Sequence, residues 1–314
     1  MAGMDVFYHD LPKAELHLHL EGAIEPETLR EIAPNLPLEE IRAHYLYDDF
    51  QGFLKSYEWV IRHLHTPEHY ALITRRLLET LERENVRYAE IILSVGVMLW
   101  RDQDPAPIYA AVSREAARSP VEVHWLIDAV RQFGVEHVMR VAEFAASHVG
   151  DGVVGFGIGG DEARGPAALF HESYRFARER GLRLTAHAGE TMGPESVWAA
   201  LELGAERIGH GIRSIEDPVL VRHLRDRNIP LEVSVSSNVA TGAVSSLAAH
   251  PIRRLYDAGV PLVLNTDDPA MFHTTLTREY ELAAREFGFS EAELRGIADN
   301  GFRYGFRGSL TFAR

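Results

Sequence analysis

The sequence predicts a (β/α)8 barrel, in the α/β class. Short apolar runs rich in Val and Ile recur eight times along the 314 residues, and stretches with helical periodicity separate several of them. Strands that alternate with helices form parallel sheets, and a barrel of this kind typically needs about 250 residues. A doubly wound open sheet is the alternative. The predicted strands are 14–20, 87–93, 121–127, 152–158, 182–186, 207–209, 230–235 and 261–264.

The same periodicity predicts the helices. The clearest are 68–84, 135–148, 167–180, 195–203 and 218–227. Segment 22–85 is too long for one crossover, so we expect it to hold extra helices over the barrel mouth. Closing helices are expected at 275–287 and 290–300, where Ser290 and Glu293 predict a capping box at the start of the second.

Composition limits the partners of the chain. It has 32 Lys+Arg and 46 Asp+Glu, a net charge of −14, which argues against nucleic acid bound through its phosphates. No apolar run approaches the ~20 residues of a membrane span, and the start lacks the features of a signal peptide. We therefore expect a cytoplasmic protein with a small-molecule ligand and no membrane contact. Residues 1–314 are expected to form one domain, and the sequence leaves the oligomeric state open.

The rare residue types restrict the chemistry. The chain has no cysteine, so any metal must be bound by His, Asp or Glu. Its only lysines are Lys13 and Lys55, and neither lies at the C-terminal end of a predicted strand. This excludes a carboxylated lysine bridging two metals and a Schiff-base lysine. A metal site in this chain is expected to be mononuclear.

Metal-binding and acidic side chains lie at or just after the C-terminal ends of four of the predicted strands. Each has an ordinary explanation by itself, such as a loop histidine or a helix cap. A barrel, however, brings all its strand ends to one rim, so a shared site explains the set better. Its members are His17, His19, His187, Glu190, His210, Asp267 and Asp268.

Imidazole and carboxylate ligands without thiolates suit Zn²⁺ better than Fe²⁺, Co²⁺ or Mn²⁺. Three His and one Asp would leave room for a water, whose pKa can fall to near 7 on such an ion. The reaction class is therefore predicted to be hydrolytic.

The ordered motifs resemble the adenosine deaminase family of the amidohydrolase superfamily across nearly the whole chain. The motifs are 14–22, 160–162, 187–190, 209–211, 236–238 and 265–269. The resemblance implies a barrel with one Zn²⁺ per chain, held by His17, His19, His187 and Asp267.

The resemblance also implies how a purine would be bound. Glu190 would lie near N1, His210 beside the attacking water, Gly160 would donate its N–H to N3, Asp268 would lie at N7, and Glu21 would meet the sugar. N1 and N7 only accept hydrogen bonds, so both facing carboxyls must be protonated when substrate binds. Hydroxide would add to C6 while N1 is protonated, and ammonia would leave. The histidine would take the proton of the water or orient it.

The substrate motifs are mixed. Glu21 stands where animal adenosine deaminases have Asp, and it resembles the adenine deaminases, which act on the free base. Segments 160–162 and 272–276 resemble the nucleoside enzymes. A third branch, which deaminates the benzoate-bearing nucleoside 6-aminodeoxyfutalosine, fits this mixture, with Arg101 as a candidate partner for the carboxylate.

We expect deamination of an adenine nucleoside, either adenosine or 6-aminodeoxyfutalosine. The alternatives are a free-adenine deaminase and a mononuclear hydrolase of another amide, lactone or ester bond. A non-catalytic metal-binding relative would lack the complete set of Glu190, His210 and Asp268.

Overall fold

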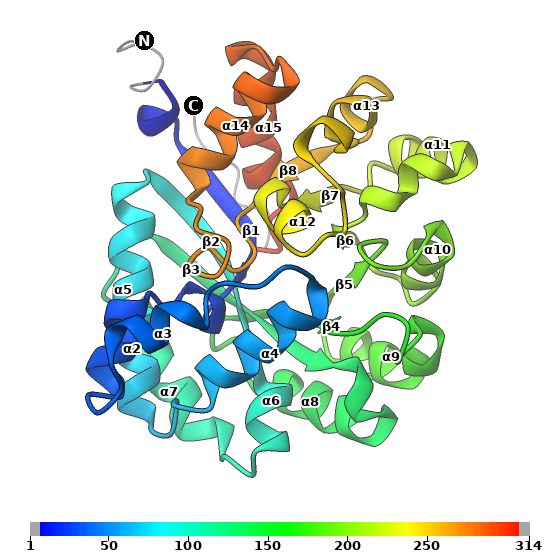
Figure 1. The fold of residues 1–314 in the computed structure, drawn as a ribbon. Helices are drawn as coiled ribbons and strands as arrows, with labels where there is room; N and C mark the ends of the chain where they lie inside the picture. Colours follow the sequence, from blue (N-terminus) through cyan, green and yellow to red (C-terminus); the bar gives the residue numbers. More distant parts are fainter. Residues whose placement is uncertain (1–6, 308–314) are drawn as a thin grey trace.

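The computed structural model describes residues 7–307 and has the architecture of a (β/α)8 barrel (Figure 1). Eight parallel strands pair in chain order, with helices around them. Most strand positions are buried, as expected for parallel strands covered by helices. They are β1 (Lys13–His19), β2 (Val86–Leu93), β3 (Glu122–Val130), β4 (Val153–Gly159), β5 (Arg183–Ala188), β6 (Arg207–His210), β7 (Leu231–Val233) and β8 (Leu262–Leu264).

The barrel closes where β1 meets the segment after β8. Leu18 forms an isolated parallel bridge with Asp267. The N–H of His19 donates to the carbonyl of Asp267 at 2.8 Å, and the N–H of Asp267 donates to the carbonyl of His17 at 3.0 Å. The side chain of Asn265 extends this pairing, because its Oδ1 accepts the N–H of His17 at 3.1 Å. The seam therefore fixes the first and last motifs beside each other.

Helices of two kinds surround the strands. The outer ring and the closing helices are α5 (Pro67–Arg83), α7 (Pro105–Ala116), α8 (Val135–Ser147), α9 (His171–Glu179), α10 (Pro194–Glu202), α11 (Pro218–Arg227), α13 (Ile252–Asp257), α14 (Leu276–Phe287) and α15 (Glu291–Tyr304). Shorter or inserted helices are α2 (Pro26–Ile32), α3 (Leu38–Ala43), α4 (Phe50–Ile61), α6 (Val95–Trp100) and α12 (Val235–Ala240). The predicted extra helices between the first two strands are thus α2, α3 and α4.

Two features fix the ends of the inserted and closing helices. Asp49 caps α4, accepting the N–H of Gly52 at 2.7 Å. The predicted capping box of Ser290 and Glu293 is confirmed at the start of α15. Among residues 7–307, no helix combines the length and apolar character needed to cross a membrane.

Several predicted boundaries need correction. β5 continues through His187 and Ala188, and β6 includes His210, where the sequence placed both histidines after their strands. Strand pairing between β5 and β6 extends to these residues, because Ala188 pairs with His210. Segment 167–180 begins as a 3₁₀ turn, η3 (Ala167–Phe170), before α9. Helix α15 also continues to Tyr304 rather than ending near residue 300.

Candidate metal and active site

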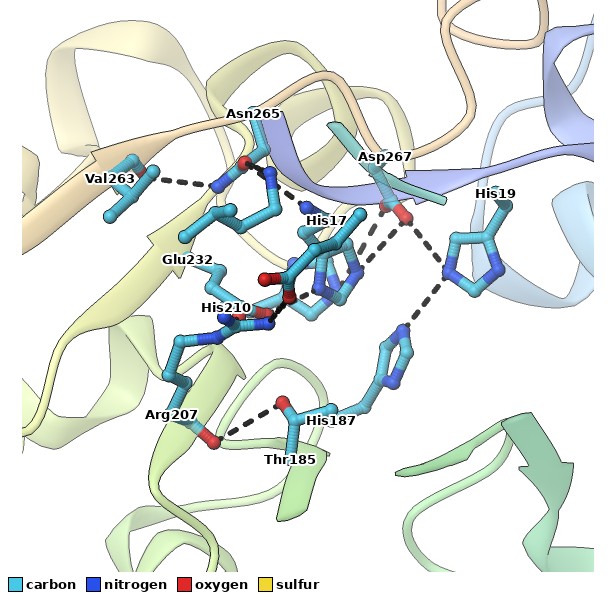
Figure 2. Close-up of polar contacts among 12 residues, drawn as sticks. His17, His19, Thr185, His187, Arg207, His210, Glu232, Val263, Asn265 and Asp267 are labelled. Carbon is cyan, nitrogen blue, oxygen red and sulfur yellow. Dashed lines mark hydrogen bonds and ion pairs between the residues drawn. The ribbon is translucent and has the colours of Figure 1, made fainter. Parts of the chain in front are cut away.

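Four of the predicted ligands converge at the C-terminal ends of β1 and β5 and at the barrel seam (Figure 2). One ligand atom from each lies within 4.8 Å of the others; the residues are His17, His19, His187 and Asp267. Nε2 of His19 lies 3.2 Å from Nε2 of His187 and 3.4 Å from Oδ1 of Asp267. Nε2 of His17 is buried and has no hydrogen-bond partner among residues 7–307. Three imidazoles and one carboxylate this close together, one of them with a buried nitrogen that lacks a hydrogen-bond partner, fit a site for a divalent cation.

A buried ionic network lies behind His17 (Figure 2). Nδ1 of His17 lies 2.8 Å from Oε2 of Glu232. Nε of Arg207 donates to Oε1 of Glu232 at 2.5 Å, and its Nη2 donates to Glu90 at 2.5 Å. Burial alone would raise the pKa of Glu232, but Arg207 and His17 hold it below its ordinary value. Because the carboxylate accepts from Nδ1, Nε2 of His17 is left free to bind a metal.

Backbone and hydroxyl groups orient two further ligands. Nδ1 of His187 lies 3.0 Å from the carbonyl of Ile158 in β4, which directs its Nε2 toward the cluster. Oδ2 of Asp267 accepts the hydroxyl of Ser237 at 2.7 Å. Asp267 has a φ of 66°, a conformation that few non-glycine residues adopt. Three of the four ligands, His17, His187 and Asp267, are therefore held by partners outside the cluster.

A cavity of about 400 Å³ opens beside this cluster. Its floor includes Asp128, Glu190, His210 and Asp268 together with three of the four ligands. One wall is the inserted helix α4, so the expectation that this segment covers the barrel mouth is confirmed. Other lining residues are Ser94, Gly159, Gly160, Phe53, Tyr57, Trp100, Phe133, Lys55 and Arg164.

The carboxyl groups on the cavity floor are strongly perturbed. Burial raises the pKa of Glu190 well above its ordinary value, and the neighbouring Asp267 and Glu162 raise it further. Burial and the adjacent Asp267 raise the pKa of Asp268 in the same way. Oδ1 of Asp268 is buried and has no hydrogen-bond partner among the described residues. Both carboxyl groups are therefore suited to remain protonated where they face the cavity.

His210 lies between the acidic groups. Its Nε2 is 3.7 Å from Oε2 of Glu190 and 3.9 Å from Oδ2 of Asp267. Its Nδ1 accepts the amide N–H of Asn238 at 3.0 Å. Like Asp267, it has a positive φ, 61°, which marks a conformation held by its surroundings.

Glu162 holds the loop that carries Glu190. Its carboxylate accepts the backbone N–H groups of Gly189 at 2.9 Å, Glu190 at 3.0 Å and Thr191 at 2.8 Å. It also accepts the hydroxyl of Ser196. Consecutive backbone N–H groups pointing at one anion form an anion-binding nest. The loop after β5 is therefore shaped around this buried carboxylate.

Arg131, in the 3₁₀ turn η2 (Arg131–Phe133) that follows β3, supports the same loop. Its Nη2 donates to the carbonyl of His187 at 2.5 Å, and its Nη1 donates to Gly165 at 3.2 Å. Burial alone would raise the pKa of Glu162, but its hydrogen bonds to the loop and the nearby charge of Arg131 lower it. Glu162 is thus ionised at neutral pH.

Two glycines allow close packing at the floor. Gly160 has a φ of +91°, which favours glycine, and its backbone lines the cavity. A Cβ on Gly22 would lie 1.7 Å from Oδ1 of Asp268. The absence of a side chain at residue 22 therefore leaves room for the carboxyl of Asp268.

The two residues expected to contact the far end of a substrate lie elsewhere. Glu21 is buried, and its Oε1 accepts the N–H of Ser94 at 3.2 Å, so its contact with a sugar stays a prediction. The suggestion that Arg101 binds a substrate carboxylate needs correction. Its guanidinium donates to the carbonyls of Ile61, Arg62 and Leu64, which closes the C-terminal end of α4.

Sequence reasoning missed the residues that support the site. Glu232 and Arg207 each stand in an apolar strand, and a charged residue inside such a run is a signal that it has a buried partner. Asn238 and Glu162 belong to motifs for which the resemblance implies no role for these two residues. The sequence shows that these charged residues are unusual, but it does not show which side chains they pair with.

Comparison with known protein families gives one match over most of the chain. A profile described as Adenosine deaminase matches residues 12–309. An adenine deaminase of Rhizobium leguminosarum bv. trifolii is 40% identical over 293 residues, covering 90% of this chain and 91% of that protein. An aminodeoxyfutalosine deaminase of Streptomyces avermitilis is 38% identical over 324 residues, covering 98% and 90%.

Solved structures resemble the fold closely. The adenine deaminase of Arthrobacter aurescens superimposes with a TM-score of 0.88 at 31% identity, covering 95% of this chain and 94% of that one. A cog1816 amidohydrolase of Burkholderia ambifaria, solved with bound Zn, has a TM-score of 0.90 at 28% identity, covering 98% and 89%.

Proposed function

This chain belongs to the adenosine deaminase family of hydrolases that act on C–N bonds, and we propose that it removes the 6-amino group of an adenine nucleoside. The products are ammonia and the 6-oxo purine. One observation carries this proposal: the four-ligand cluster shares a cavity floor with the buried carboxyls of Glu190 and Asp268. A hydrolase of a simple ester would not need two protonated carboxyl groups beside its metal site, whereas a purine ring offers two nitrogens, N1 and N7, that accept hydrogen bonds.

We propose Zn²⁺ as the metal, one per chain, held by His17, His19, His187 and Asp267. The nitrogen-rich donor set without thiolates favours it, and one structural relative contains Zn. When bound, such a cation supplies the Lewis acidity that makes water nucleophilic near neutral pH.

The protein side chains then act on the ring. Glu190 donates a proton to N1 as oxygen adds to C6, so that negative charge does not build up on the ring. Asp268, in its protonated form, donates a hydrogen bond to N7. The N–H of Gly160 faces N3. His210 lies beside the attacking oxygen. The exocyclic amino group takes the proton of the added hydroxyl and leaves as ammonia, so that C6 becomes a carbonyl. Glu190 regains its proton from the water of the next turnover.

The outer part of the cavity favours a substrate larger than free adenine. A cavity of about 400 Å³ lies within the range of about 300–1,000 Å³ usual for small-molecule sites. Trp100 and Phe133 stack at a ring separation of 5.1 Å and an angle of 12° along its wall. Lys55 and Arg164 line it as well, and neither has an ion pair or side-chain hydrogen bond within residues 7–307.

These groups suit a nucleoside that carries an aromatic acid, as 6-aminodeoxyfutalosine does, and we propose it ahead of adenosine. Unpaired cations at the mouth would attract its carboxylate. Free adenine is the second candidate, because relatives of about 40% identity are named adenine deaminases and because Glu21 resembles theirs.

A substrate panel tests the proposal. The Zn²⁺-loaded enzyme is given 6-aminodeoxyfutalosine, adenosine and adenine, and both the loss of adenine absorbance and the release of ammonia are followed. We expect kcat/KM to be highest for a nucleoside. A hundredfold preference for adenine would contradict the nucleoside proposal, and no ammonia from any of the three would contradict deamination.

Glu190→Gln provides the mechanistic control. It should lower kcat about 10²- to 10⁴-fold, as expected for loss of a general acid, while the metal content stays the same. Glu202→Gln, on the outer helix α10, should change neither quantity. Ester turnover that survives Glu190→Gln would instead favour a different hydrolase.

A further inference from the structure

A directional chain of hydrogen bonds leads from the backbone to His210. The N–H of Ile252 donates to Nδ1 of His250 at 3.2 Å. Nε2 of His250 lies 3.2 Å from Oδ1 of Asn238, and Nδ2 of Asn238 lies 3.0 Å from Nδ1 of His210. His250, Asn238 and His210 are all at most 5% exposed, so water does not substitute for these contacts.

Each link in this chain has only one polarity. A backbone N–H can only donate, so Nδ1 of His250 accepts and its proton is on Nε2. That proton must go to the oxygen of the Asn238 amide, which leaves the NH₂ group facing His210. The opposite amide orientation would set two donors against each other at His250. Burial also lowers the pKa of His250 to about 4, so it is neutral near pH 7.

The consequence appears on the cavity side of His210. Because Nδ1 accepts the Asn238 amide, the proton of the neutral ring is on Nε2, which points toward Glu190 and Asp267. A protonated Nε2 can donate a hydrogen bond but has no lone pair with which to accept a proton or bind a metal.

We infer that Asn238 and His250 are positioning residues that hold His210 in its Nε2–H tautomer, so that it donates a hydrogen bond to the oxygen that adds to C6. This rests on the proposed deaminase function. In this tautomer His210 orients the attacking oxygen and cannot take a proton from it. The proton for N1 still comes from Glu190.

Nitrogen NMR of the Zn²⁺-loaded enzyme tests the tautomer without relying on activity. The chain has 16 histidines, so the signals of His210 are assigned by comparison with His210→Asn after ¹⁵N-histidine labelling. We expect Nδ1 of His210 to give an unprotonated signal and Nε2 a protonated one near pH 7. A protonated Nδ1, or a doubly protonated ring, would overturn the inference.

Asn238→Asp tests whether the tautomer matters. Its carboxylate can only accept, so it should move the proton of His210 to Nδ1. A reversed histidine tautomer costs about 10⁴ in kcat in the serine-protease triad, and we expect a fall of roughly 10²- to 10⁴-fold here. KM should change less than about threefold, and bound zinc should not change. Asn228→Asp, at the exposed end of α11, is the matched control.

A pair of variants at His250 decides the matter if Asn238→Asp does not fold. His250→Gln keeps an N–H for Oδ1 of Asn238 and should retain most of kcat, whereas His250→Leu should lose roughly tenfold and show mixed tautomers. Equal kcat in the two variants, or full activity in Asn238→Asp with reversed signals, would overturn the inference. A wild type that deaminates no adenine compound would instead refute the proposed function, whatever the spectrum shows.

Discussion

Nδ1 of His17 and Oε2 of Glu232 lie 2.8 Å apart, and both side chains are at most 2% exposed. This contact joins the ligand cluster to the Arg207 and Glu90 network in the barrel interior. A carboxylate that accepts from a metal-binding imidazole fixes the orientation of the ring and increases its basicity. The ability of the barrel to retain a cation therefore depends on a residue that does not touch it.

We predict that Glu232→Gln weakens zinc retention by about 10- to 100-fold, the usual effect of losing such a partner. Competition between the protein and a chromophoric chelator measures this. Glu206→Gln removes an exposed carboxylate that pairs with Arg183 at the other end of the barrel and should leave zinc affinity unchanged. Equal affinity in the two variants would show that Glu232 does not support the metal site.

Gly22→Ala should displace the carboxyl of Asp268, because the new Cβ would stand 1.7 Å from its Oδ1. We expect kcat/KM for the nucleoside to fall by roughly 100-fold, since a displacement of about 1 Å can cost that much. Zinc content should be retained, because Gly22 does not contact the ligand atoms. Measuring both quantities separates loss of the purine contact from loss of the metal.

Gly296→Ala is the control for this substitution. A Cβ at residue 296 meets nothing within 4 Å, and the residue lies inside α15. Alanine there should keep activity and stabilise the protein by about 0.5–1 kcal/mol. Full activity in Gly22→Ala would mean that Asp268 does not need its present position.

Replacing Lys55 and Arg164 together by Met should lower selectivity for an acidic nucleoside. We expect kcat/KM for 6-aminodeoxyfutalosine to fall roughly 10-fold and its salt dependence to weaken, because the charges that attract the carboxylate are gone. The values for adenosine should remain within about twofold.

Arg62→Met provides the comparison. Arg62 follows the same helix α4 but is already paired with Glu58 at 2.5 Å and does not line the cavity. Arg62→Met should leave kcat/KM unchanged for both substrates. If the double variant lowers kcat/KM equally for adenosine and for the acidic nucleoside, Lys55 and Arg164 do not recognise the carboxylate.

Glu162→Gln should lower kcat about 10- to 100-fold, because the loop that carries Glu190 loses part of its anionic anchor. Glu195→Gln changes an exposed carboxylate in the same region, which among residues 7–307 accepts only the N–H of Gly193. This variant should have little effect on kcat. Stopped-flow or steady-state turnover at saturating substrate distinguishes them. Similar rates in the two variants would contradict a positioning role for Glu162.

The same carboxylate should influence acid stability. Its pKa is lowered in the folded protein from an ordinary value of 4.5, so the unfolded chain binds the proton more tightly. The stabilisation it provides is complete above about pH 4.5 and is lost as the pH falls through the lower folded value. Chemical unfolding from pH 6 to pH 3 should therefore show a shallower loss of stability for Glu162→Gln than for the wild type.

The barrel and the family were predictable because they depend on patterns that are local in sequence. Short apolar runs, capping residues and the order of the motifs can all be recognised from the sequence alone, and the fold and family they indicate are confirmed. The gathering of His17, His187 and Asp267 followed from the rule that parallel strands end at one rim.

The supporting contacts could not be predicted in the same way. Glu232 is recognisable as a charge inside an apolar strand, but its pairing with both His17 and Arg207 depends on three strands meeting inside the barrel. The error at Arg101 has the same origin. Only the folded chain shows that the end of α4 offers three carbonyl groups to its guanidinium.

The seam between β1 and the segment after β8 makes cation binding depend on closure of the barrel, because His17 and His19 lie on one side of it and Asp267 on the other. Along the chain the three imidazoles precede Asp267, so the metal site lacks its carboxylate until the segment after β8 pairs with β1. Once the ring has closed, any cation held across the join favours the closed form by mass action. Stripping the ion should accordingly accelerate amide hydrogen exchange at residues 16–19 and 265–268 before it affects the outer helices.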